Sequence, residues 1–153
     1  MRAILAAFAI AAPLAAQAEW SFTDTYTIAS APSNGMRMVI DCSRPGGEAQ
    51  FRLDGYALFG TDTPHTGPTG FLLGDRLEDV YGAECTAGSC VIGPAPNASA
   101  AVQARQMPAL LAEWRAREVV DFVEYRGGPV AAFDMTGSAR AIAELEAAGC
   151  RMP

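Results

Sequence analysis

His65 is the single histidine of the chain, and its imidazole could take part in more kinds of reaction than any other side chain of the sequence. It stands close to Asp62 in a segment rich in proline, glycine and threonine, residues 61–70. An imidazole beside a carboxylate is able to act as a general base or to bind a metal ion. A zinc site needs three or four ligands, and the sequence has no His-x-x-x-His or Cys-x-x-Cys pattern. We therefore predict no catalytic residue, no metal and no cofactor, with a small envelope hydrolase using His65 and an acidic partner as the alternative.

Two other reactive groups match no catalytic spacing. The densest acidic group consists of Asp75, Glu78, Asp79 and Glu84. Paired carboxylates hydrolyse glycosides or bind calcium, but this spacing fits neither an EF-hand loop nor another fixed motif. Gly88-Ser89-Cys90 lacks the Gly-x-Ser-x-Gly pattern of a nucleophile elbow. A solvated acidic surface and a structural turn are therefore favoured.

The cysteines predict a covalent framework. The chain contains Cys42, Cys85, Cys90 and Cys150, and an even number in an exported protein indicates two disulfides. Cys85 and Cys90 are separated by a four-residue turn sequence, so we pair them, which leaves Cys42 with Cys150. The spacing of Cys85 and Cys90 is not that of a thioredoxin motif, and a structural role is favoured.

Residues 1–18 are predicted to be a secretory signal peptide. Arg2 provides the charged start, Ile4–Leu14 is apolar, and Ala16-Gln17-Ala18 fits a cleavage site. The remainder, residues 19–153, has a length typical of one domain with a hydrophobic core. We expect a periplasmic or secreted protein that does not insert into a membrane after cleavage.

The charge balance narrows the range of partners. The net charge is −6, and the basic residues are scattered along the chain. Such a surface repels phosphate groups, which argues against nucleic acid and anionic membrane surfaces as ligands. A protein or a cell-envelope component is the expected partner.

Strands are expected where apolar and polar residues alternate or β-branched residues gather. These segments are residues 20–30, 36–42, 49–54, 91–92, 118–125 and 130–135. The first three are expected to form an antiparallel meander, with Phe51 and Leu53 inward. Residues 56–59 are a candidate further strand, residues 75–81 are a helical turn or a strand, and residues 61–70 are expected to be a loop.

Two helices are expected. Pro108 suits the first helical position of a helix that ends near Arg115, while residues 99–106 stay ambiguous between helix and strand. A second helix follows Ser138 as N-cap and ends before Gly149, whose place suits a left-handed C′ residue.

The elements predict an α+β fold. A mainly antiparallel, curved β-sheet or sandwich of about six to eight strands carries one or two short helices. The C-terminal helix packs on the sheet, and two disulfides join the elements.

This pattern resembles small exported proteins of Gram-negative bacteria, among them the VasI-like accessory proteins of type VI secretion. The shared features are Trp20, the strand with Cys42, a Leu-Leu segment followed by strands, and Phe133-x-x-x-Gly137-Ser138-x-x-Ala141-x-x-x-Leu145 ending at Cys150. The chain departs from it in the Cys85/Cys90 pair and the segment around His65. The resemblance implies a β-rich, disulfide-compatible fold and a non-catalytic accessory role.

The expected function is therefore that of an exported binding or accessory module, which acts through protein or envelope contacts. Long loops on a rigid scaffold commonly carry recognition. The predicted contact residues are Asp62, Pro64, His65 and Thr66, together with the hairpin tip at residues 85–90.

Overall fold

The computed structural model of the chain describes residues 20–24, 27–29, 35–74 and 79–153. The predicted signal peptide lies outside these residues. The elements in chain order are β1 (Ser21–Asp24), β2 (Thr27–Ala29), β3 (Arg37–Asp41), β4 (Gln50–Asp54), β5 (Gly67–Leu72), β6 (Val80–Thr86), β7 (Ser89–Gly93), α1 (Ala100–Ala116), β8 (Val119–Glu124), β9 (Pro129–Asp134) and α2 (Ser138–Ala147). None of the described helices is long and apolar enough to span a membrane.

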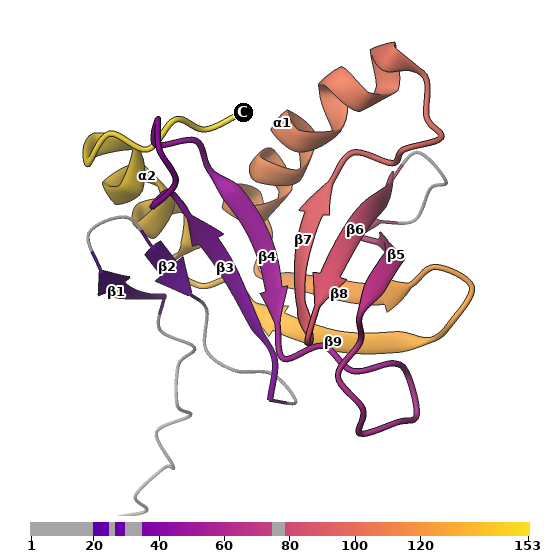
Figure 1. Cartoon of the computed structure of the whole chain (residues 1–153). Helices are drawn as coiled ribbons and strands as arrows, with labels where there is room; N and C mark the ends of the chain where they lie inside the picture. Colours follow the sequence, from indigo (N-terminus) through magenta and orange to yellow (C-terminus); the bar gives the residue numbers. More distant parts are fainter. Residues whose placement is uncertain (1–19, 25–26, 30–34, 75–78) are drawn as a thin grey trace, which may run out of the picture.

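The strands form one curved antiparallel sheet in the order β1-β2-β3-β4-β7-β6-β5-β8-β9. Figure 1 shows β8 and β9 running behind the other strands, while α1 and α2 lie beyond the upper part of the sheet. The α+β class and the meander are confirmed. The described strands number nine, for two reasons. Residues 20–30, expected to be one strand, contain both β1 and β2, which pair with each other, and β5 and most of β6 lie where the sequence predicts no strand.

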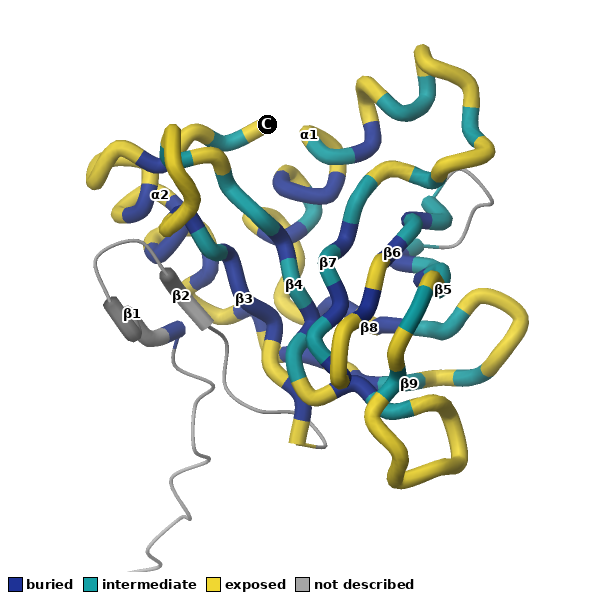
Figure 2. The backbone as a smooth tube through the Cα atoms, viewed as in Figure 1, coloured by how far each residue is buried: buried dark blue, intermediate teal, exposed yellow. Residues whose placement is uncertain are grey.

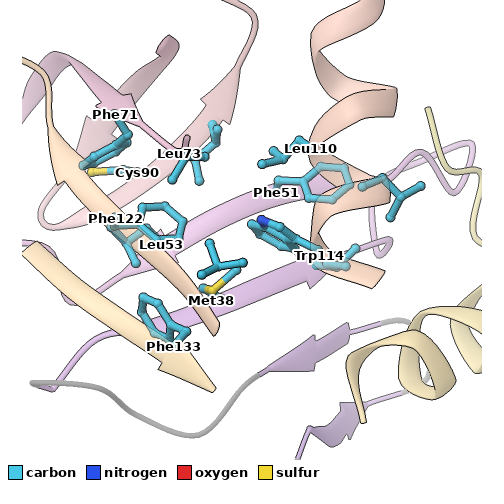
Figure 3. Packing of buried hydrophobic residues seen from close by; sticks show 14 of the residues in the cluster. Met38, Phe51, Leu53, Phe71, Leu73, Cys90, Leu110, Trp114, Phe122 and Phe133 are labelled. Carbon is cyan, nitrogen blue, oxygen red and sulfur yellow. The ribbon is translucent and has the colours of Figure 1, made fainter. Parts of the chain in front are cut away.

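The core lies between the inner face of the sheet and α1. In β3 and β4, Met38, Ile40, Phe51 and Leu53 alternate inward and are at most 1 % exposed. Figure 3 shows Trp114 of α1 beside Phe51, with ring centroids 5.2 Å apart. The two-residue alternation and the helical stripe therefore meet in one apolar cluster.

The first half of β5 corrects the expected loop at residues 61–70. The loop ends at Thr66, and Gly67–Leu72 pairs with β6 along its whole length. Pro68 is tolerated because β8 pairs with β5 only at Phe71 and Leu72, so Pro68 sits on an open strand edge. Residues 56–59, expected to extend a strand, form only a single bridge between Ala57 and Pro64.

Helix α1 begins eight residues before the expected start, since Pro108 lies inside it and not at its first position. Ser99 is the N-cap, and its side chain accepts a hydrogen bond from the amide of Val102. Pro108 is on the exposed side of the helix, where its missing amide proton leaves a carbonyl that water is able to reach. The ambiguous residues 99–106 are thus the cap and first half of α1.

Helix α2 has the predicted end but not the predicted cap. Gly137 is the N-cap, whereas Ser138 is buried and donates its hydroxyl proton to the carbonyl oxygen of Trp114 at 2.6 Å. Gly149 has φ +101°, and its amide and that of Cys150 donate to Glu146 and Leu145. These two bonds are the Schellman arrangement that the position of Gly149 predicts.

Both predicted disulfides are present. Cys42 at the end of β3 is bonded to Cys150 beyond α2, across 108 residues of sequence. Cys85 and Cys90 are bonded across the β6–β7 hairpin, where they are direct cross-strand partners. All four cysteines are at least 95 % buried.

Removing the long-range disulfide should cost more stability than removing the short one. In the loop-closure model, Cys42–Cys150 contributes about 5 kcal/mol and Cys85–Cys90 about 2 kcal/mol. Urea unfolding of Cys42→Ala/Cys150→Ala and Cys85→Ala/Cys90→Ala measures both under non-reducing conditions. A larger loss in the Cys85/Cys90 variant would contradict this ranking.

Candidate functional site

The two predicted contact regions lie side by side. Residues 56–66 form the loop after β4, and its main chain is fastened to the β6–β7 turn. The amide of Tyr56 donates to the carbonyl of Gly88 at 2.8 Å, and the amide of Gly88 donates to the carbonyl of His65 at 2.8 Å. The amide of Ala87 donates to the Thr66 hydroxyl at 3.3 Å. The loop and the hairpin tip therefore form one end of the sheet, with Asp62, Pro64 and Thr66 exposed.

His65 is a packing residue of this end. Its ring stands edge to face on Tyr56, with centroids 5.4 Å apart. Its Nε2 atom is buried and has no hydrogen-bond partner among the described residues. His65 has no ion pair with a described carboxylate, and it lines none of the surface hollows described below. Its surroundings resemble neither a general-base site nor a metal site.

The other predicted reactive groups are dispersed or engaged. Asp75 and Glu78 lie outside the described residues, while Glu84 is exposed on β6. The Ser89 hydroxyl donates to the Asp54 carboxylate at 2.6 Å, and the same carboxylate is bound by the guanidinium of Arg52, so Ser89 belongs to a polar cluster on the sheet. In the described part of the chain, no three Asp, Glu, His or Cys side chains lie close enough together to hold a metal ion.

Tyr56 connects the loop to the sheet beneath it. The residue is fully buried and packs edge to face on Phe71, with centroids 5.2 Å apart. Burial, and next the Glu124 carboxylate, raise the pKa of Tyr56 to about 12, against a smaller opposing effect of Thr69. The hydroxyl thus stays protonated at neutral pH, and the ring of Tyr56 packs between His65 of the loop and Phe71 of β5.

A row of glycines crosses the outer face of the sheet. Gly70 of β5 pairs with Gly82 of β6, and Gly82 pairs with Gly93 of β7. Cross-strand partners point to the same face of a sheet, so the missing side chains leave a strip of backbone that is open at Gly93 and covered at Gly82, where an added β-carbon would lie 2.8 Å from Pro96 Cδ. The inward residues on either side of Gly82, Tyr81 and Ala83, are buried. The strip is therefore on the face opposite the core.

Two adjoining hollows that are open to solvent lie along the glycine row. One of about 570 Å³ includes Gly70 and Gly82, and the other of about 290 Å³ includes Gly82 and Gly93. Both contain Pro68, Thr69, Gly82 and Pro96 in their walls, and Pro96 covers Gly82. We call the two hollows together the glycine groove; its described lining also includes Val80, Tyr81, Ala83, Glu84, Val91, Pro94, Ala95, Asn97, Ala98 and Tyr125.

The segment 94–98 forms one wall of the glycine groove, and two glutamines of α1 fix its position. Gln106 is buried; its side chain accepts from the amide of Ala95 at 2.9 Å and donates to the carbonyl of Val80 at 2.8 Å. Gln103 donates to the carbonyl of Ala95 at 2.9 Å. These bonds hold the wall against β6 at a fixed distance, so that the groove exists without a ligand.

Aromatic side chains continue the apolar surface at the β5 end of the groove. Tyr125 is 41 % exposed, and its β-carbon would lie 3.3 Å from a β-carbon added at Gly70. Phe59 is 59 % exposed, and its ring lies against Gly128. Gly128 belongs to the β8–β9 turn, which also contains Tyr125. Figure 2 shows this turn and the neighbouring loop as largely exposed chain. An exposed aromatic pair beside a preformed groove is typical of a contact surface.

Charge is distributed unevenly around the groove. Glu84 is the charged side chain among the described lining residues, and it forms no ion pair with a described cation. Arg52, two strands away in the same cross-strand row, is engaged by Asp41 and Asp54. Burial acts to raise the pKa of Asp41, but hydrogen bonds from Ser43 and the charge of Arg52 outweigh it and lower that pKa.

Sequence reasoning missed the glycine groove, although a signal exists. Gly70, Gly82 and Gly93 stand inside or at the end of strands, where glycine is unfavourable and usually marks a close approach of backbone. The first of them falls inside the expected loop at residues 61–70. Only the strand register places the three side by side.

Comparisons with models of protein families, with curated proteins and with solved structures return no match for this chain. The resemblance to VasI-like accessory proteins therefore stays a prediction, and the site is interpreted from its own geometry.

Alanine at Gly82 should destabilise the protein, whereas alanine at Gly93 should not. An added β-carbon at Gly82 would lie 2.8 Å from Pro96 Cδ and 3.0 Å from the Pro94 carbonyl oxygen, while one at Gly93 meets nothing within 4 Å. Overpacking of this kind costs about 1–3 kcal/mol. Urea unfolding of the two variants compares them directly, and equal stabilities would show that segment 94–98 does not press on Gly82.

The protein should lose stability as the pH rises from about 10 to about 12. Tyr56 ionises near 10 in the unfolded chain and near 12 in the fold, so alkali favours the unfolded state in this window. Urea unfolding at about pH 9 and about pH 11.5 should show a smaller alkaline loss for Tyr56→Phe than for the unmodified protein. Burial also raises the pKa of Tyr81 to about 12, so Tyr81→Phe should have a similar effect. An unchanged alkaline loss in both variants would refute this assignment.

Proposed function

We propose that the chain is an exported, non-catalytic binding module, which acts by surface contact with a protein or another cell-envelope component. The observation that carries the proposal is the glycine groove: it is preformed, open, mostly apolar and continued by the exposed Tyr125 and Phe59. Patches of this kind on a soluble domain commonly mark interaction sites. The two disulfides support export, because such bonds persist in oxidising compartments.

The centre of the proposed contact surface is not the loop that the sequence predicts. The loop residues Asp62, Pro64, His65 and Thr66 belong to the end of the sheet that borders β5, and they stay part of the proposal as a flank. The centre moves to the groove, because that is where apolar surface and recessed shape coincide. The long-range disulfide and the sheet hold this surface rigid, which lowers the entropic cost of binding.

The state of the reactive side chains supports a non-catalytic role. His65 lacks a described carboxylate partner, Ser89 is hydrogen-bonded to Asp54, and Tyr56 keeps its proton. A hydrolase that uses His65 remains the alternative. It has the weaker support, because the buried Nε2 atom of His65 faces no group that would supply or orient a reacting water.

Capture of partners by the exported form, residues 19–153, tests the proposed function. The protein is used as bait in envelope extract, together with Tyr125→Ala and with Val119→Ala as a matched control. Val119 is 52 % exposed but lies at the start of β8, at the opposite end of that strand from Tyr125. We expect a specific partner that Val119→Ala retains and whose recovery Tyr125→Ala lowers by about tenfold, as for an aromatic anchor residue of an interface.

Point variants are preferable to deletion of residues 61–70, because the second half of that segment is part of β5. Equal recovery by both variants would exclude the groove end as the contact surface. Hydrolytic activity that disappears in His65→Ala would instead establish the alternative function.

A further inference from the structure

We infer that the glycine groove binds a short, extended, apolar peptide segment that carries one lysine or arginine side chain. The inference rests on the proposed binding function and adds the chemical class of the ligand. It follows from three properties of the groove: its shape, its lining and the position of Glu84.

The shape suits an extended chain. The smaller hollow crosses β5, β6 and β7 along the cross-strand row of Pro68, Glu84 and Val91, which at about 4.8 Å per strand spacing is about 10 Å. An extended segment rises about 3.3 Å per residue, so about three to four residues fill this length. Gly93 leaves the backbone bare at the β7 end, because an added β-carbon there meets nothing within 4 Å, and a segment is able to approach closely at this point.

The lining suits apolar side chains more than polyhydroxylated or phosphorylated ligands. Most of the described wall consists of apolar or aromatic residues, namely Pro68, Pro94, Pro96, Val80, Val91, Ala95, Ala98 and Tyr125. Tyr81 is not an available donor at the groove, because its hydroxyl already donates to the carbonyl of Gln106 at 3.2 Å. A sugar would leave many hydroxyl groups unpaired against this wall. A phosphate would find no cation among the described lining residues, and the nearby guanidinium of Arg126 is stacked over the Tyr125 ring, 5.2 Å from its centroid.

The exposed carboxylate of Glu84 is the reason for the positive charge that we assign to the ligand. It lies between Pro68 and Val91 in the cross-strand row next to the glycines and is exposed. Its carboxylate has no described cation as partner, and the nearest arginine in that row, Arg52, is engaged by two aspartates. A basic side chain could lay its aliphatic part along the apolar wall and place its charge at Glu84.

The ligand class is tested with two labelled peptides, acetyl-Ala-Pro-Val-Lys-Val-Pro-Ala-amide and the same peptide with glutamine in place of lysine. Fluorescence anisotropy measures their dissociation constants for the exported form and for Glu84→Gln, Gly93→Val and Glu118→Gln. Gly93→Val fills the groove where an added β-carbon meets nothing within 4 Å, so the fold is kept. Glu118 is an exposed glutamate at the start of β8 and is the matched charge control.

We expect the lysine peptide to bind about two- to fivefold more tightly than the glutamine peptide, which is the strength of an exposed ion pair. Glu84→Gln should abolish this difference, and Glu118→Gln should preserve it. Gly93→Val should weaken both peptides by at least about tenfold, because its side chain occupies the floor. Since the chain contains no lysine, carbodiimide coupling of the lysine peptide should join its amine to Glu84, as peptide mapping by mass spectrometry would show.

Unchanged binding to Gly93→Val, or no binding of either peptide, would overturn the inference. Equal affinity for both peptides, together with loss in Gly93→Val, would overturn the basic side chain in particular. The partner capture described above uses neither peptide, so a partner that depends on Tyr125 would still support the proposed function in each of these cases.

Discussion

The bond between Cys42 and Cys150 is the constraint on which the arrangement of the helices depends. It joins Cys42, directly after β3, to Cys150, which lies beyond the end of α2, and so holds α2 beside the meander. Helix α2 in turn positions α1, since Ser138 donates to the carbonyl of Trp114 and an ion pair links Arg115 to Glu146. Helix α1 then carries the glutamines that fix the wall of the glycine groove. The disulfide beside β3 is thus linked through both helices to the wall of the groove that lies over β5, β6 and β7.

Most of the fold could be predicted because its signals are local. The alternation in residues 36–42 and 49–54 identified β3 and β4, and the spacing of the cysteines identified both disulfides. The errors arose where tertiary contacts override local preference. Pro108 lies inside a helix because its side faces solvent, and Ser138 gives up the N-cap position to bond Trp114. Segment 61–70 reads as loop by composition, yet its second half is held by pairing with β6.

The site could be predicted only in part, for a similar reason. The loop with His65 and the hairpin tip with Cys85 and Cys90 were both expected to be surface features, and the structure adds that they touch. The glycine groove depends on which residues are cross-strand neighbours. Gly70, Gly82 and Gly93 are far apart in sequence, and a change of register by one residue would remove the row.

Amide hydrogen exchange of residues 19–153, alone and with a partner recovered in the capture experiment, tests most directly the proposal that the glycine groove is the contact surface. We expect added protection in β5, β6 and the segment 94–98, with little change in α2. Protection confined to α2 and the exposed half of α1 would contradict it, because the partner would then occupy the face of the molecule that the helices form.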